Sequence, residues 1–98
     1  MNTWTRETKV PGQEPKTEVG DAQDDFFRGV IGDGKAEVSM TVGFSLSYGE
    51  VKVSATVRLT CNQDEGTINA VGERAFYKAH ELASDGLTLI TEEIQRKA

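Results

Sequence analysis

The sequence has one cysteine, one histidine and two prolines among its 98 residues, and aromatic residues make up only 7% of it. A single cysteine excludes an intramolecular disulfide and a zinc site built from cysteines, which argues against the class of disulfide-stapled secreted proteins. No apolar run approaches the roughly 20 residues of a membrane-spanning helix, and residues 1–10 lack the apolar core of a signal peptide. We therefore expect a cytoplasmic protein without a membrane segment or a cofactor.

Basic residues are also in the minority, because 11 Lys and Arg stand against 16 Asp and Glu, which makes the formal net charge −5. Binding to duplex DNA relies on Lys and Arg at the phosphates, so this balance argues against duplex DNA as a partner. Acidic residues concentrate between residues 14 and 33, and Asp24 and Asp25 lie within this run. Such a run is either a solvated surface or a negative patch that faces a basic partner.

Residues 1–20 are predicted to be a flexible tail, and residues 21–98 a single α+β domain. The first segment holds both prolines and few aliphatic residues, which is too little apolar area to offset about 1–2 kcal/mol of backbone ordering per residue. Trp4 stands out there, either as a Trp on a mobile arm or as an anchor that docks on a partner. For residues 21–34 two alternatives stay open: a short helical turn, or a short edge strand that ends at the Gly-Asp-Gly of residues 32–34.

Strict alternation of apolar and polar residues runs through residues 35–61. The even positions from 36 to 46 are apolar, and the odd positions from 51 to 61 are apolar as well. This period of two is typical of strands that bury one face. The expected antiparallel hairpin places Leu46 opposite Val51, and a slip by one residue would set each apolar side chain against a polar one.

After the second strand, the apolar residues recur at steps of three and four, which is typical of a helix with one buried face. We expect one long helix from residue 63 to 96, with Asn62 and Glu65 as a capping box at its start and at most a kink at Gly86. Small residues form a ridge within the apolar stripe, which would allow close packing against a sheet or another helix. The ridge consists of Gly72, Ala75, Ala79, Ala83 and Gly86.

One hairpin under one helix has a thin core, and a two-stranded sheet is marginally stable in water. Both strands would also expose an edge that can pair with another strand. We therefore expect a homodimer or a higher assembly, formed either by hairpins that join edge to edge into a four-stranded sheet or by helices that pack through the ridge. The alternative is that residues 21–34 cover one edge as a third strand.

The residues that could carry catalysis do not assemble an active site. Cys61 falls on the apolar side of its strand, which favours a buried and inert thiol. His80 lies at the border of the helix stripe, which favours a packed ring with an exposed tip over a catalytic base. One histidine and one cysteine cannot ligate zinc without carboxylates or a second subunit. We therefore expect a protein that is not an enzyme and holds no metal.

Aromatic residues in polar surroundings favour binding to another protein. Tyr48 stands at the predicted turn between the strands, Tyr77 lies on the polar face of the predicted helix, and Trp4 lies on the predicted tail. Together with Asp24 and Asp25 they are the candidate protein-binding residues. The first functional hypothesis is therefore a small acidic inhibitor or adaptor that binds a protein.

The second hypothesis is an accessory protein that binds single-stranded nucleic acid through the polar face of the hairpin. This face carries several Ser and Thr residues and three basic candidates, Lys35, Lys52 and Arg58. Single-strand binding normally uses aromatic side chains on which bases stack, and this face has none except Tyr48 at its tip. The first hypothesis is therefore preferred.

The stretch VKVSATVRLTCNQDE at residues 51–65, which leads into residues 67–70, resembles uncharacterised small proteins of bacteriophages and prophages. The shared layout is a strand that ends in Cys, a short polar turn and a long helix, and the likeness extends over residues 35–90. The resemblance implies a phage accessory protein in the bacterial cytoplasm, in a class that includes inhibitors of host defence and helpers of phage DNA metabolism. The partner would then be a host or phage protein.

Overall fold

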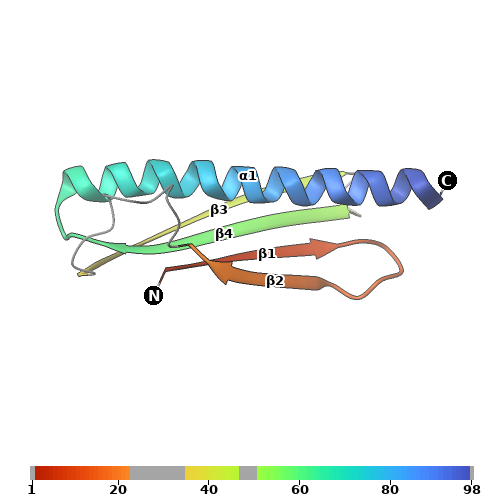
Figure 1. Cartoon of the computed structure of the whole chain (residues 1–98), viewed down its shortest axis with the longest axis horizontal. Helices are drawn as coiled ribbons and strands as arrows, with labels where there is room; N and C mark the ends of the chain where they lie inside the picture. Colours follow the sequence, from red (N-terminus) through yellow and green to blue (C-terminus); the bar gives the residue numbers. More distant parts are fainter. Residues whose placement is uncertain (1, 23–34, 47–50, 98) are drawn as a thin grey trace.

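The structure is a computed structural model that describes residues 2–22, 35–46 and 51–97. For residues 94–97 it describes the backbone alone. The described strands form one antiparallel sheet with the order β2-β1-β4-β3, and one long helix lies along it (Figure 1). This is an α+β fold, as the sequence predicted. The elements are β1 (Thr3–Lys9), β2 (Lys16–Asp21), β3 (Ala36–Leu46), β4 (Val51–Cys61) and α1 (Glu65–Lys97).

The predicted hairpin is confirmed with its register. Leu46 pairs with Val51 at one end of the β3–β4 ladder and Ala36 pairs with Cys61 at the other. The apolar side chains of β4 are all buried, and those of β3 are half-buried except Leu46, which is exposed. The core therefore lies between β4 and the helix, and β3 closes one flank of it.

Helix α1 is continuous through Gly86 and buries the predicted ridge of small residues against the sheet of its own chain. Ala75, Ala79 and Ala83 are completely buried, and a Cβ atom added at Gly86 would lie 2.9 Å from Cγ1 of Val53. The ridge thus lets the helix lie close to β4. The alternative in which two helices associate through this ridge is wrong, because the ridge is already covered.

The predicted capping box is wrong, because the helix starts two residues later than expected. Asp64 is the capping residue: its Oδ1 accepts a hydrogen bond of 2.9 Å from the backbone N–H of Thr67. The backbone N–H of Ile68 donates to the carbonyl oxygen of Asp64 at 2.9 Å, the first bond of the helical ladder. Asn62 and Glu65 therefore do not form the reciprocal pair that their spacing suggested.

The predicted tail at residues 1–20 is the main error of the sequence interpretation, because this segment forms β1 and β2. A tight turn joins the two strands, with Pro11 and the positive φ of 78° at Gly12 as its central residues, and the N–H of Gln13 donates to the carbonyl of Val10 at 3.1 Å. This is the arrangement of a type II turn. The hairpin belongs to the α+β domain.

Strand β1 pairs with β4 over seven residues, from Thr3–Arg58 to Lys9–Lys52. It therefore covers the β4 edge that we expected to be free. The four-stranded sheet that we expected from two chains forms within one chain. Of residues 21–34, which we suggested as a third strand, the structure describes Asp21 at the end of β2 and the buried Ala22. The other residues of that segment lie outside the described ranges.

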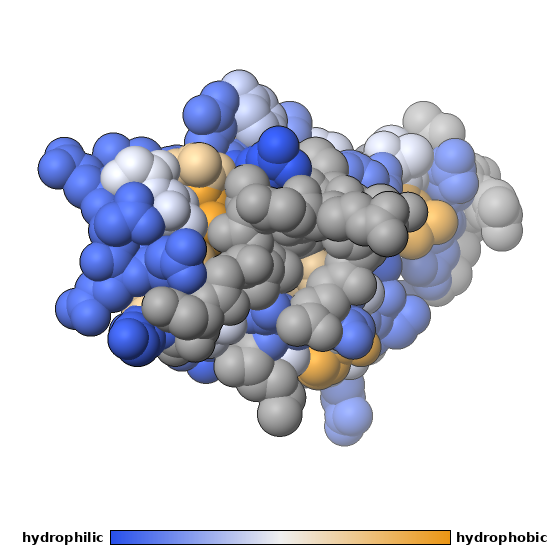
Figure 2. All heavy atoms as spheres, turned by 60° about the vertical axis from the view of Figure 1, so that its left-hand side comes forward, coloured by the Kyte–Doolittle hydropathy of each residue, from blue (hydrophilic) through white to orange (hydrophobic). Residues whose placement is uncertain are grey.

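The molecule is elongated, with extents of 49 × 22 × 18 Å, because a helix of 33 residues at 1.5 Å per residue sets its length. Helix α1 lies over β3 and β4 about equally and contacts β1 much less. At the end of the molecule shown in Figure 2, the coloured hydrophobic residues reach the surface in small areas separated by hydrophilic ones.

Candidate functional site

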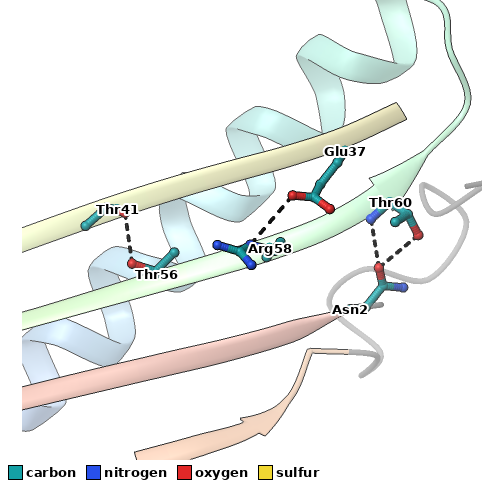
Figure 3. Close-up of polar contacts among 6 residues, drawn as sticks. All are labelled: Asn2, Glu37, Thr41, Thr56, Arg58 and Thr60. Atoms are coloured by element: carbon teal, nitrogen blue, oxygen red, sulfur yellow. Dashed lines mark hydrogen bonds and ion pairs between the residues drawn. The ribbon is translucent and has the colours of Figure 1, made fainter. Parts of the chain in front are cut away.

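Two surfaces of the described residues are open to a partner, and the first is the face of the sheet opposite α1, called the outer face here. Hydroxyl groups dominate it, and Thr5, Thr56 and Thr41 lie side by side across three strands. The hydroxyl oxygens of Thr41 and Thr56 are 2.9 Å apart and share a hydrogen bond (Figure 3). This part of the outer face satisfies some of its own hydrogen-bonding groups.

The basic residues predicted for nucleic-acid binding lie on or beside the outer face. Arg58 lies 3.6 Å from a carboxylate oxygen of Glu37 (Figure 3), and both side chains are more than half exposed, so this ion pair is weak. Lys52 is exposed and pairs across the ladder with Lys9, a neighbour that the sequence interpretation missed because it placed residue 9 in a tail. Lys35 is exposed and immediately precedes β3.

Aromatic side chains are absent from the described part of the outer face. The one described aromatic residue of β1, Trp4, pairs with Val57 and therefore points to the same side of the sheet as the core. It is half-buried and packs against the core. The interpretation of Trp4 as a residue on a mobile arm is wrong, and a role as an anchor for a partner is not supported by its packing.

The second open surface lies beside β3, where four rings form what we call the aromatic cluster. The ring of His80 is 5.5 Å from that of Phe44 and 6.3 Å from that of Phe76, and the rings of Phe76 and Tyr77 are 5.8 Å apart. Phe76 is 42% exposed and Tyr77 is 56% exposed. The predicted exposure of Tyr77 is thus confirmed, whereas Phe76, which the helical period assigned to the core stripe, is exposed at its border.

The aromatic cluster lies level with the middle of β3. One turn towards the start of the helix, Gly72 faces Val38, to which an added Cβ would come within 3.8 Å. One turn towards its end, His80 contacts Phe44. Phe76 lies halfway between these two helix positions, so it is level with the centre of the strand, near Thr41.

The outer edges of the sheet differ in charge. Strand β3 has one charged residue, Glu37, among its eleven residues, and β2 has three among its six. No strand within the described ranges pairs with the outer edge of β3. Proteins commonly protect sheet edges with charged residues or proline, and a long uncharged edge is a template for pairing. Of the two outer edges of the described sheet, that of β3 is therefore the longer and the less charged.

Of the remaining predicted site residues, the structure describes Cys61 and His80. Cys61 is completely buried, and His80 is exposed and packed edge-on against Phe44. Across residues 2–22, 35–46 and 51–93, no three His, Cys, Asp or Glu side chains are grouped to hold a metal ion. Tyr48, Asp24 and Asp25 lie outside the described residues. No helix in the described part of the chain combines the length and the apolar character that crossing a membrane requires.

Comparisons of the chain with protein-family models, with curated proteins and with solved structures found no match. Its function must therefore be argued from the two open surfaces themselves.

Proposed function

We propose that this chain is a small non-enzymatic module that binds another protein chain through the outer edge of β3 and the aromatic cluster beside it. The observation that carries this proposal is the coincidence of two features along one flank. A long, nearly uncharged strand edge runs beside exposed Phe76 and Tyr77. Each feature alone is common on protein surfaces, but together they combine directional backbone bonding with apolar contact area.

The strand edge supplies the directional part of the binding. An extended segment of a partner can add a strand to an exposed sheet edge, where backbone hydrogen bonds give affinity and side-chain contacts give specificity. The aromatic cluster supplies the apolar part, since Tyr is among the residues that contribute most to binding energy in interfaces. A partner strand on β3 would run along the flank of α1 on which His80 contacts Phe44 and Phe76 contacts His80.

The proposed binding edge also suits the more specific role that a resemblance of residues 35–90 to small phage and prophage proteins implies. An inhibitor or adaptor of a macromolecular machine in the bacterial cytoplasm needs a binding edge and no catalytic centre.

Photo-crosslinking in the cells that produce the protein tests this proposal. A benzophenone amino acid replaces Tyr77 in one variant and Leu89 in the control variant, because Leu89 is similarly exposed, at 57%, and lies near the turn between β1 and β2. We expect covalent protein adducts from position 77 and few from position 89. Equal yields at both positions, or none at position 77, would overturn the proposal.

Binding of single-stranded nucleic acid through the outer face is the second candidate. The cross-strand pair of Lys9 and Lys52 favours it, since two like charges side by side attract phosphates. A mobility shift with a single-stranded oligonucleotide that weakens steeply with salt and is lost in Lys52→Glu would support this candidate. The absence of aromatic side chains from the described outer face makes it the weaker of the two.

A further inference from the structure

We infer that the partner of the β3 edge is a second copy of this chain, which pairs its own β3 antiparallel about a two-fold axis at Thr41. This inference rests on the proposed function and names the occupant of that site. The result would be a continuous sheet of eight strands with both helices on one face.

Strand β3 is complementary to itself. Thr41 is the central residue of Ala36–Leu46, so an antiparallel copy centred there uses the whole strand. Apolar positions then face apolar positions of the partner and polar ones face polar ones, because the partner of residue i is residue 82 − i, which has the same parity. Glu37 faces a serine, so no like charges oppose each other within the strand pair. The resulting pairs are Ala36 with Leu46, Val38 with Phe44, Met40 with Val42, Glu37 with Ser45, Ser39 with Gly43, and Thr41 with itself.

Pairing along β3 also sets the distance between the two helices. Helix α1 lies over β3 and β4 about equally, and neighbouring strands are about 4.8 Å apart. The axis of α1 is therefore about 5 Å to the side of a two-fold axis at the β3 edge, which places two helix axes about 10 Å apart. Packed helices have axes 8–10 Å apart. Strand pairing thus brings the two helices into contact without any change in the chain.

The position of the aromatic cluster along α1 also fits a two-fold axis at Thr41. Because Phe76 is level with the middle of β3, a two-fold axis at Thr41 brings the two clusters to the same height between the two helices. There Phe76 of each copy loses the exposure of 42% that it has in the single chain. The half-buried apolar row of β3 is covered by the same contact.

Sedimentation velocity of the purified full chain over a range of micromolar concentrations tests the inference. We expect twice the monomer mass for the wild type and for the control Leu89→Glu. Phe76→Glu, which places a charge in the contact, and Thr41→Lys, which opposes two like charges at the axis, should each raise the dissociation constant about tenfold or more. Circular dichroism shows whether each variant is folded. A monomeric wild type, or folded variants that dimerise as tightly as it does, would overturn the inference.

A disulfide across the axis tests the register without depending on destabilising changes. Residues that face themselves in an antiparallel pair have Cα atoms about 4.5–5.5 Å apart, which a disulfide can bridge. In a Cys61→Ala background, Thr41→Cys should form a covalent dimer under mild oxidation, whereas Ser45→Cys, which faces Glu37, should not. Crosslinking of Ser45→Cys in preference to Thr41→Cys would overturn this register.

The crosslinking experiment at Tyr77 distinguishes failure of the inferred dimer from failure of the proposed protein-binding function. Adducts of twice the monomer mass support the second copy. If the chain sediments as a monomer and its adducts contain a different protein, the inference of a second copy is overturned. The proposed protein-binding function is then still supported. Absence of adducts at position 77 overturns the proposed function itself.

Discussion

The indole ring of Trp4 lies against the backbone of Gly20, its neighbour across the β1–β2 ladder. A Cβ atom at Gly20 would overlap the ring. A glycine in a strand packs poorly by itself, and an aromatic residue on the neighbouring strand compensates by covering it. This contact joins the strands of the first hairpin and holds Trp4 against the core.

Gly20→Ala should therefore displace the indole ring and loosen the first hairpin. We expect the free energy of unfolding to fall by about 1–3 kcal/mol, the usual cost of an overpacked contact. Because Trp4 is the single tryptophan, the fluorescence emission of folded Gly20→Ala should lie at a longer wavelength than that of the folded wild type. Gly43→Ala is the control, since its Cβ would meet nothing closer than 3.7 Å. An unchanged emission spectrum in Gly20→Ala would contradict the contact.

Two helix glycines should respond to alanine with opposite signs. In an unobstructed helix, alanine is more stable than glycine by about 1 kcal/mol. At Gly72 the added Cβ lies 3.8 Å from Val38, an ordinary contact, so Gly72→Ala should stabilise the protein. At Gly86 it lies 2.9 Å from Cγ1 of Val53 and 3.0 Å from Cδ of Arg6, and buried Val53 cannot move aside, so Gly86→Ala should destabilise it by about 1–3 kcal/mol. Urea unfolding of both variants measures the two signs.

Arg6 connects three elements, and its partners should be energetically coupled. One guanidinium nitrogen donates to the carbonyl of Leu82 at 3.2 Å and another to a carboxylate oxygen of Glu18 at 2.6 Å. The side chain of Arg6 is 11% exposed and that of Glu18 is 33% exposed, so water compensates in part for a lost carboxylate. We expect Glu18→Ala to lower the free energy of unfolding by about 1 kcal/mol. The loss should be smaller in an Arg6→Met background, because the buried guanidinium charge is then absent. A double-mutant cycle measures the coupling, and strictly additive effects would contradict it.

The helix cap should make stability depend on acid pH. Hydrogen bonds from the Thr67 side chain and backbone to the carboxylate hold the pKa of Asp64 below its ordinary value of 3.8. Because the folded-state pKa is lowered, this contribution is complete above pH 3.8 and is lost as the pH falls through the folded-state pKa. Asp64→Asn keeps a capping oxygen without a titrating group.

We therefore expect the melting temperature of wild type to fall more steeply than that of Asp64→Asn as the pH is lowered from 5 to below the folded-state pKa of Asp64. Asn62→Ala is the matched control, because the structure assigns the cap to Asp64, and its pH dependence should follow that of wild type. Parallel curves for wild type and Asp64→Asn would show that the cap does not titrate in this range.

Local pattern was sufficient for the second hairpin and the helix. In β3 and β4 the period of two is unbroken, and a slip by one residue would set the apolar side chains against polar ones, so the pairing follows from adjacent segments alone. The helix stripe follows in the same way from residues three and four apart. The start of the helix was misplaced because the Asn62–Glu65 and Asp64–Thr67 spacings both suit a cap, and only the structure shows which side chain accepts the bond.

The first hairpin could not be read from its composition, because its stability comes from partners far along the chain. Pro11-Gly12 was a signal for a turn that could have revealed it. The strands on either side bury little by themselves, and β1 is held by the edge of β4, more than 40 residues later in the sequence. A charged residue such as Arg6 is expected to be exposed from the sequence alone, and only the fold shows that Glu18, Leu82 and Gly86 surround it.

The sequence by itself determined where apolar side chains alternate and recur, and hence the β3–β4 register and the length of α1, because these depend on neighbours within a few residues. Only the tertiary structure decided which strands form the outer edges of the described sheet and which aromatic residues lie beside the β3 edge. The edge of β4 is closed by a distant strand, and Phe76 lies at the border of the helix stripe, where the width of the sheet beneath determines burial.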